Sequence, residues 1–216
     1  MSEANCEFGL ELGSWPGLEA QVAAIADDIA YDNHDIDDGL RAGILKLDEL
    51  IALPIAARHW HAIGERHPDI APDRRQRALV RDQIGTMVGD VLDETRRRVA
   101  EAGVETIDEV RAAGRALVGF SAALAEEERA LKAFLTDRLY NSPELVPVRK
   151  EAQRVVANLA AAYRADPNSL PEAWRTGDSK TAQLRRIGDF IAGMTDRFAI
   201  ARHRELIGPV ELPDRF

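Results

Sequence analysis

The sequence predicts an all-α protein, and three observations support this fold class. Apolar residues recur with the helical period from Leu18 to Leu206. No alternation of apolar and polar residues lasts longer than about four or five residues, which is too short to predict a sheet. Prolines, glycines and N-capping residues separate the periodic segments, as is typical of helices joined by short loops. Because no repeat, low-complexity stretch or linker is visible, we expect one domain over residues 1–216.

The first part of the chain favours three helices. The sequence SWPG precedes a helix expected over about residues 18–33, in which Val22 and Ile29 belong to one apolar stripe. Asp38-Gly39 is expected to break the chain. A second helix then covers residues 40–53 and ends before proline, and a third covers residues 56–66 and stops at the sequence HPDIAPD.

The rest of the chain favours four longer helices. The first is expected over about residues 74–102, followed by a C-terminal glycine and a new N-cap at Thr106 in the sequence GVET. Two further helices follow. The first is expected to end at the sequence NSPELVP, and the second at the loop DPNSLPEAW. These later helices are expected over residues 121–140, 148–164 and 181–203.

Composition excludes several classes of protein. The net charge is −9 and the pI about 5.1, so the chain carries no strong nucleic-acid-binding signal. Cys6 is the only cysteine, which excludes an intramolecular disulfide framework and fits a reducing compartment. No apolar run is long enough to span a membrane, and the N-terminus lacks the features of a signal peptide. We therefore expect a cytoplasmic protein without membrane partners.

Six aspartates between Asp27 and Asp38 form the most unusual feature of the sequence. Asp27, Tyr31 and Asp35 are spaced i, i+4, i+8, so they share one helix face if the first helix continues through Asp35. A tyrosine between two carboxylates offers a ring for stacking and a hydroxyl for hydrogen bonding, which suits a divalent cation together with a sugar. The alternative is a solvated acidic face near a helix end. Neither an EF-hand nor a zinc-protease helix fits the spacing.

Two long motifs carry a family resemblance. The segments EAQVAAIADDIAYDNHDIDDGLRAGIL (residues 19–45) and FIAGMTDRFAIARH (residues 190–203) resemble the second half of HD-domain deoxynucleoside triphosphate triphosphohydrolases, the dGTPase-like proteins. The segments TDRLYNSPELV and VRDQIGTMVGDVL fit the intervening part of that family. The resemblance covers about residues 14–207 and implies a multi-helical HD-domain-type fold, of which this chain is the C-terminal half.

The resemblance also implies roles for the aspartate cluster. Asp27 would be the fourth ligand of a mononuclear metal site, Tyr31 would pack on the deoxyribose, and Asp35 would accept a hydrogen bond from its 3′-hydroxyl. The family's other metal ligands, a histidine and a His-Asp pair, and its catalytic residues precede the point where this chain begins. A divalent metal ion, Mg²⁺, Mn²⁺ or similar, is therefore expected only with the missing half, and no catalytic residue is assigned.

A triphosphate carries several negative charges, so basic residues are expected to bind it. Arg41 and Arg81 are the best candidates for contacts with phosphate or with a neighbouring subunit. Each has an alternative interpretation as a helix-surface arginine paired to Asp38 or Asp82. The histidines elsewhere in the chain (His59, His61, His67 and His203) are not expected to replace the absent metal ligands.

The functional hypothesis is a triphosphohydrolase that converts a deoxynucleoside triphosphate such as dGTP into deoxynucleoside and tripolyphosphate, with this chain inactive when alone. The expected partners are the nucleotide and either further copies of the chain, through an exposed apolar patch, or a second chain that supplies the N-terminal half. The alternative is a non-catalytic helical subunit or interaction module derived from a truncated relative.

Overall fold

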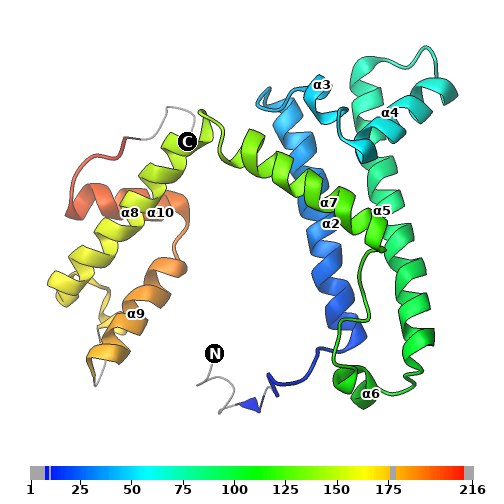
Figure 1. Cartoon of the computed structure of the whole chain (residues 1–216). Coiled ribbons are helices and arrows are strands. Elements are labelled where there is room, and N and C mark those ends of the chain that lie inside the picture. The colour runs from blue at the N-terminus through cyan, green and yellow to red at the C-terminus, as the bar shows by residue number, and fades with distance from the viewer. Residues whose placement is uncertain (1–7, 10, 176–178, 212–216) are drawn as a thin grey trace. The chain divides into compact units, whose positions relative to one another are not determined.

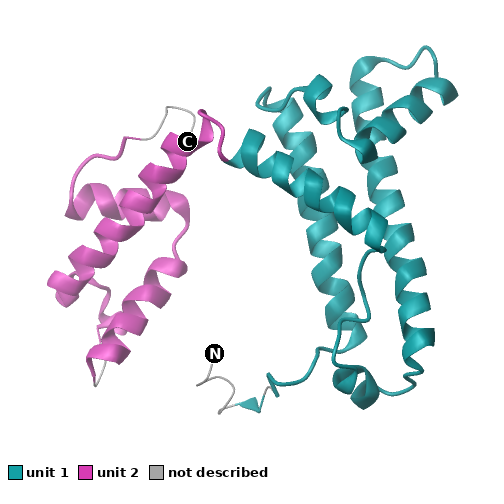
Figure 2. Ribbon diagram, in the orientation of Figure 1, with its two compact units in different colours: residues 1–140 teal, residues 141–216 magenta. Residues whose placement is uncertain are grey.

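A computed structural model of the chain describes residues 8, 9, 11–175 and 179–211, and every regular element among them is helical (Figure 1). The all-α prediction is therefore confirmed for this part of the chain. None of the helices in these residues is both long and apolar enough to cross a membrane. The chain divides into two compact units, residues 1–140 and 141–216 (Figure 2), which are described separately. That the two make one domain stays a prediction.

The first unit is built around helix α2, Leu18–Arg41, which packs against the long helix α5 and against α7 (Figure 1). Its apolar core draws Ile29 from α2, Met87 from α5 and Leu124 from α7. Burial of these side chains is what holds the three helices together. The other elements of the unit are α3 (Leu47–Leu50), α4 (Pro54–Arg66), α5 (Pro72–Ala102), α6 (Ile107–Ala112), α7 (Ala122–Leu135) and the π-helix η1 (Thr136–Tyr140).

Helix α2 is longer than the sequence predicted. The expected break at Asp38-Gly39 is wrong, because the helix continues to Arg41 with Gly39 inside it. A β-carbon on Gly39 would lie only 2.6 Å from Cγ of Leu45, so the glycine makes room for a buried leucine that folds back onto the helix. The helix therefore reaches past Asp35, which keeps the whole Asp27–Asp35 stripe on one regular element.

The predicted helix over residues 40–53 is also wrong, since the chain leaves α2 after Arg41 and is α-helical again only over Leu47–Leu50. The chain turns at Gly43, where φ is +73°, a left-handed conformation that favours glycine. The amide of Leu45 then donates a hydrogen bond to the carbonyl of Gly39, which anchors the turn to the end of α2. Leu45 and Leu50 are both buried, so the short α3 serves to close the core.

Helices α4 and α5 agree with the sequence. Pro54 and Pro72 occupy the first turns, and Gly103 ends α5 in the left-handed conformation. Thr106 caps α6 with a complete capping box to Glu109, as the sequence GVET predicted for a new N-terminus. A buried amide pair joins α5 to α2, where Gln83 donates to the side-chain oxygen of Asn33 at 3.0 Å.

The second unit contains α8 (Leu145–Ala165), α9 (Lys180–Ala192) and α10 (Asp196–Leu206), with two 3₁₀ turns, η2 (Pro167–Ser169) and η3 (Glu172–Trp174). Helix α8 packs against both α9 and α10, around Tyr163 and Phe190, whose rings meet edge to face. The single helix predicted over residues 181–203 is wrong, because it breaks between Ala192 and Asp196. Thr195 starts α10 by accepting a hydrogen bond from the amide of Phe198.

Candidate functional site

The predicted site stripe lies on one side of α2. Because α2 is unbroken from Leu18 to Arg41, residues four apart stand one above the other, so Asp27, Tyr31 and Asp35 follow one line along the helix. Asp27 is exposed, Tyr31 is 63% exposed, and Asp35 is half-buried. The tyrosine ring is therefore open to a ligand from the outside of the first unit.

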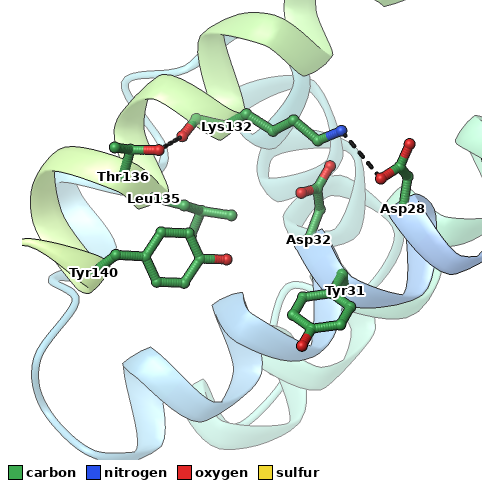
Figure 3. A pocket seen from close by; sticks show the side chains of 7 residues that line it. All are labelled: Asp28, Tyr31, Asp32, Lys132, Leu135, Thr136 and Tyr140. Atoms are coloured by element: carbon green, nitrogen blue, oxygen red, sulfur yellow. Dashed lines mark hydrogen bonds and ion pairs between the residues drawn. The ribbon is translucent and has the colours of Figure 1, made fainter. Parts of the chain in front are cut away.

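Next to this stripe the structure has a pocket of about 210 Å³ between α2 and the end of α7 (Figure 3). Tyr31 lines the pocket, whereas Asp27 and Asp35 are not among its lining residues. Figure 3 shows Lys132 extending from α7 toward α2, and the phenol of Tyr140 pointing to the same side as Asp32 and Tyr31. The lining residues are Asp28, Tyr31 and Asp32 of α2, Lys132 and Leu135 of α7, and Thr136 and Tyr140 of η1.

Tyr140 connects the pocket to the stripe. Its hydroxyl donates a hydrogen bond to Oδ2 of Asp35, from a position 105 residues later in the chain. Burial, followed by the hydrogen bond to Asp35 and by its charge, raises the pKa of Tyr140 above the ordinary value of a phenol. The hydroxyl therefore stays protonated, as a donor, throughout the neutral range.

Asp32 is the buried carboxyl of the pocket, with only 3% of its surface exposed. Its Oδ2 has no hydrogen-bond partner among the residues that the structure describes. Burial raises the pKa of Asp32 to about 7, the ammonium of Lys132 opposes that shift, and the carboxylates of Glu128, Asp28 and Asp35 add to it. Near neutral pH this group therefore exchanges between a neutral acid and a buried anion.

Lys132 is the pocket's cation and is shared between two carboxylates. Its Nζ lies 2.5 Å from Oε1 of Glu128 and 3.4 Å from Oδ1 of Asp28. With Asp28, Asp32, Asp35 and Glu128 close by, the carboxylates outnumber this one ammonium group. The pocket itself therefore favours a neutral, hydrogen-bonding ligand group over a phosphate.

The two candidate arginines lie on exposed helix surfaces. Nη1 of Arg41 is 3.5 Å from Asp37, a different partner from the Asp38 that the alternative interpretation named. Nη2 of Arg81 is 3.5 Å from Asp82, the partner that the alternative interpretation named, and the side chain of Arg81 is 79% exposed. Neither arginine lines the pocket at Tyr31. Any contact with phosphate would have to form outside it.

The residues that the structure describes do not make a complete metal site. Among them there is no group of three or more histidine, cysteine or acidic side chains placed to hold an ion. Asp27 therefore belongs to no such group within the described ranges. His203 is buried in the second unit, where its ring bonds to Asn158 and to the carbonyl of Gly208, which indicates a structural role.

Sequence reasoning identified Tyr31 and Asp35 but missed Tyr140 and Asp32. Tyr140 belongs to the segment TDRLYNSPELV, whose resemblance to the family was visible, but its approach to Asp35 depends on the π-helix that ends α7. Asp32 appeared to be one aspartate among six. Its burial depends on α7 packing against α2, for which no local signal exists.

Comparisons with known proteins agree with the family that the two motifs indicated. Residues 118–205 match the family described as the phosphohydrolase-associated domain. The chain is 49% identical over 211 residues to a deoxyguanosinetriphosphate triphosphohydrolase-like protein of Nitrobacter hamburgensis. The matched region covers 95% of this chain and 52% of that relative. Proteins of the same name from Brucella ovis and Bradyrhizobium diazoefficiens are 47% and 46% identical over 94% and 92% of this chain.

These proteins are relatives of the chain across nearly its whole length. The match covers 51% of the Brucella ovis protein and 50% of the Bradyrhizobium diazoefficiens protein. The chain therefore spans about half the length of the curated relatives that it matches.

Proposed function

We propose that this chain forms the deoxyribose-binding side of a deoxynucleoside triphosphate triphosphohydrolase. In the proposed reaction the oxygen of water attacks the α-phosphorus of a nucleotide such as dGTP. The bond from that phosphorus to O5′ breaks, so the products are a deoxynucleoside, which leaves with a proton, and tripolyphosphate. The support is the similarity to relatives named for this class of activity, together with the Tyr31–Asp35 arrangement on α2.

Tyr31 supplies the observation that carries the proposal. The residue is 63% exposed and lies one helical turn from Asp35 on the same line of α2. An aromatic face packs well on the apolar C2′ side of a deoxyribose, and Asp35 is within reach to accept a hydrogen bond from the 3′-hydroxyl. A ribose would press its 2′-hydroxyl against the ring, where that group loses its water partners, so deoxyribose is preferred.

Asp27 takes the role of one ligand to a divalent ion such as Mg²⁺ or Mn²⁺ in this proposal. Because the described residues hold no complete cluster, the remaining ligands and the acid–base groups come from outside them, in a longer protein or on a partner chain. Further copies of the chain and a cytoplasmic location belong to the same proposal. The described residues hold the nucleotide and supply one ligand of the ion, and the bond-making step falls to groups outside them.

A titration of the 216-residue chain with nucleotides, followed by nuclear magnetic resonance, tests the sugar site. We expect dGTP to perturb residues around Tyr31 with millimolar affinity, because few contacts are present, and GTP to bind more weakly. Tyr31→Ala should abolish this preference, whereas Tyr31→Phe, which keeps the ring, should retain it. Equal affinity for dGTP and GTP, or perturbations confined to the second unit, would favour the non-catalytic interaction module instead.

A further inference from the structure

We propose that helix α4 is a pH-sensitive element of the first unit. It stays packed on α5 and tied to α7 while His59 is neutral, and it loosens when the imidazole takes up a proton. The inference does not depend on the proposed function. It assigns a role to a histidine that the sequence had marked only as an unsuitable metal ligand.

His59 lies on the line of α4 that faces the core. It stands one helical turn from Ile55 and one turn from Ile63, and both isoleucines are almost completely buried. Helix α4 packs against α5 (Figure 1), and the core cluster that contains Ile55 also includes Met87 of α5 and Leu124 of α7. The imidazole is therefore placed where α4 meets the other two helices.

The ring nitrogen Nε2 of His59 is buried and has no hydrogen-bond partner among the described residues. In a neutral imidazole one ring nitrogen carries no proton, so it leaves no donor unpaired. In the protonated ring both nitrogens are donors, and Nε2–H would be buried with nothing to accept its hydrogen bond. Burial accordingly lowers the pKa of His59, and the guanidinium of Arg58 lowers it further.

Four charged side chains lie close enough to act on His59, and they neutralise one another in pairs. Arg58 of α4 donates from both terminal nitrogens to the carboxylate of Glu127 on α7. Arg66 of α4 pairs with Asp82 of α5. A proton on His59 would therefore add a positive charge beside two guanidinium groups whose carboxylates are already paired.

The two carboxylates stay ionised while the histidine titrates. The hydrogen bond and charge of Arg58 lower the pKa of Glu127. At Asp82 burial acts to raise the pKa, but the hydrogen bond and charge of Arg66 outweigh it and lower the pKa. Because His59 has a lower pKa when folded than the ordinary 6.5, its neutral form contributes full stability above pH 6.5, which is lost as the pH falls below that value.

Hydrogen exchange of the α4 amides tests the proposal on the 216-residue chain, at about pH 7.5 and 5.5 and corrected for the intrinsic effect of pH. In the wild-type chain their protection should fall by up to about tenfold at the lower pH, the limit set by a histidine of ordinary pKa in the open state. His59→Gln, which cannot titrate, should remove this loss. His61→Gln, the same substitution on the exposed side of α4, is the matched control.

The comparison between chains at each pH isolates the contribution of His59. Other groups that titrate in this range, such as Asp32, are shared by the wild type and both variants. A loss of protection that is as large in His59→Gln as in the wild-type chain would contradict the proposal. Circular dichroism at pH 7.5 should show that each variant keeps its helical content.

A second readout uses the wild-type chain alone, so it decides the matter even if a variant does not fold. The imidazole of His59, followed by its carbon and nitrogen resonances, should take up its proton at a lower pH in the folded chain than in urea. Titration at the same pH in both states would overturn the inference, because α4 would then gain nothing from a neutral histidine.

Discussion

At the scale of a single residue, burial of Asp32 disfavours the charged form of its carboxyl group. Its pKa is raised from an ordinary 3.8 to about 7, mainly by burial. An acid with a raised pKa holds its proton more tightly in the folded state, so its contribution to stability is fully present below pH 3.8. That contribution is lost as the pH rises through 7, above which the folded protein contains a buried anion.

Replacing Asp32 by asparagine should therefore stabilise the chain at high pH and not at low pH. We expect a gain of up to about 4 kcal/mol in the free energy of unfolding at about pH 8, and a smaller gain of about 1–2 kcal/mol at about pH 5, which lies between the two pKa values. Urea unfolding of both proteins at the two pH values measures the difference. Asp37→Asn, the same substitution at a more exposed position of the same helix, is the matched control. An equal effect of Asp32→Asn at both pH values would contradict the assignment.

Two residues of the candidate site could be placed together from the sequence and two could not, for a physical reason. Tyr31 and Asp35 lie on one helix, where spacing alone fixes their shared face. Tyr140 and Asp32 owe their environment to the packing of α7 and η1 on α2, about a hundred residues apart in sequence. Helical periodicity carries no information about such a contact.

Helix ends illustrate the same contrast at the scale of elements. Gly103 at the end of α5 and the N-cap at Thr106 are local signals, and both were predicted correctly. The continuation of α2 through Gly39 depends on Leu45 packing against it, which no local pattern shows. The break before α10 did have a local signal, Gly193 followed by Thr195, which the continuous apolar period on both sides obscured.

Glycines inside two helices should respond to alanine in opposite directions. Gly39→Ala should destabilise the chain by about 1–3 kcal/mol, because its β-carbon would overlap buried Leu45. Gly85→Ala, in α5 with nothing within 4 Å of the new carbon, should stabilise it by up to about 1 kcal/mol. Thermal and urea unfolding measure both. A Gly39→Ala chain as stable as the wild type would mean that α2 ends earlier than described.

Self-association is the expectation at the scale of the whole molecule. Val88 and Leu92 are one turn apart on α5 and are 42% and 50% exposed, which makes an apolar strip on the outside of the first unit. Sedimentation of the chain at rising concentration should show a species larger than the monomer, and Leu92→Glu should shift it toward the monomer. A wild-type chain that stays monomeric at high concentration would contradict this expectation.

Hydrolysis of dGTP, measured as released tripolyphosphate and deoxyguanosine, tests the central claim most directly. The chain is assayed with Mn²⁺, first alone and then co-expressed with the part of the Nitrobacter hamburgensis relative that it leaves unmatched. We expect no activity from the chain alone, because a single aspartate does not hold such an ion tightly, and metal-dependent activity from the combination.

Asp27→Ala should lower the activity of the combination by at least about a hundredfold. Asp38→Ala, at an exposed position on the same helix, should leave it unchanged. Metal-dependent tripolyphosphate release by the chain alone, or an active combination that Asp27→Ala does not impair, would contradict the account.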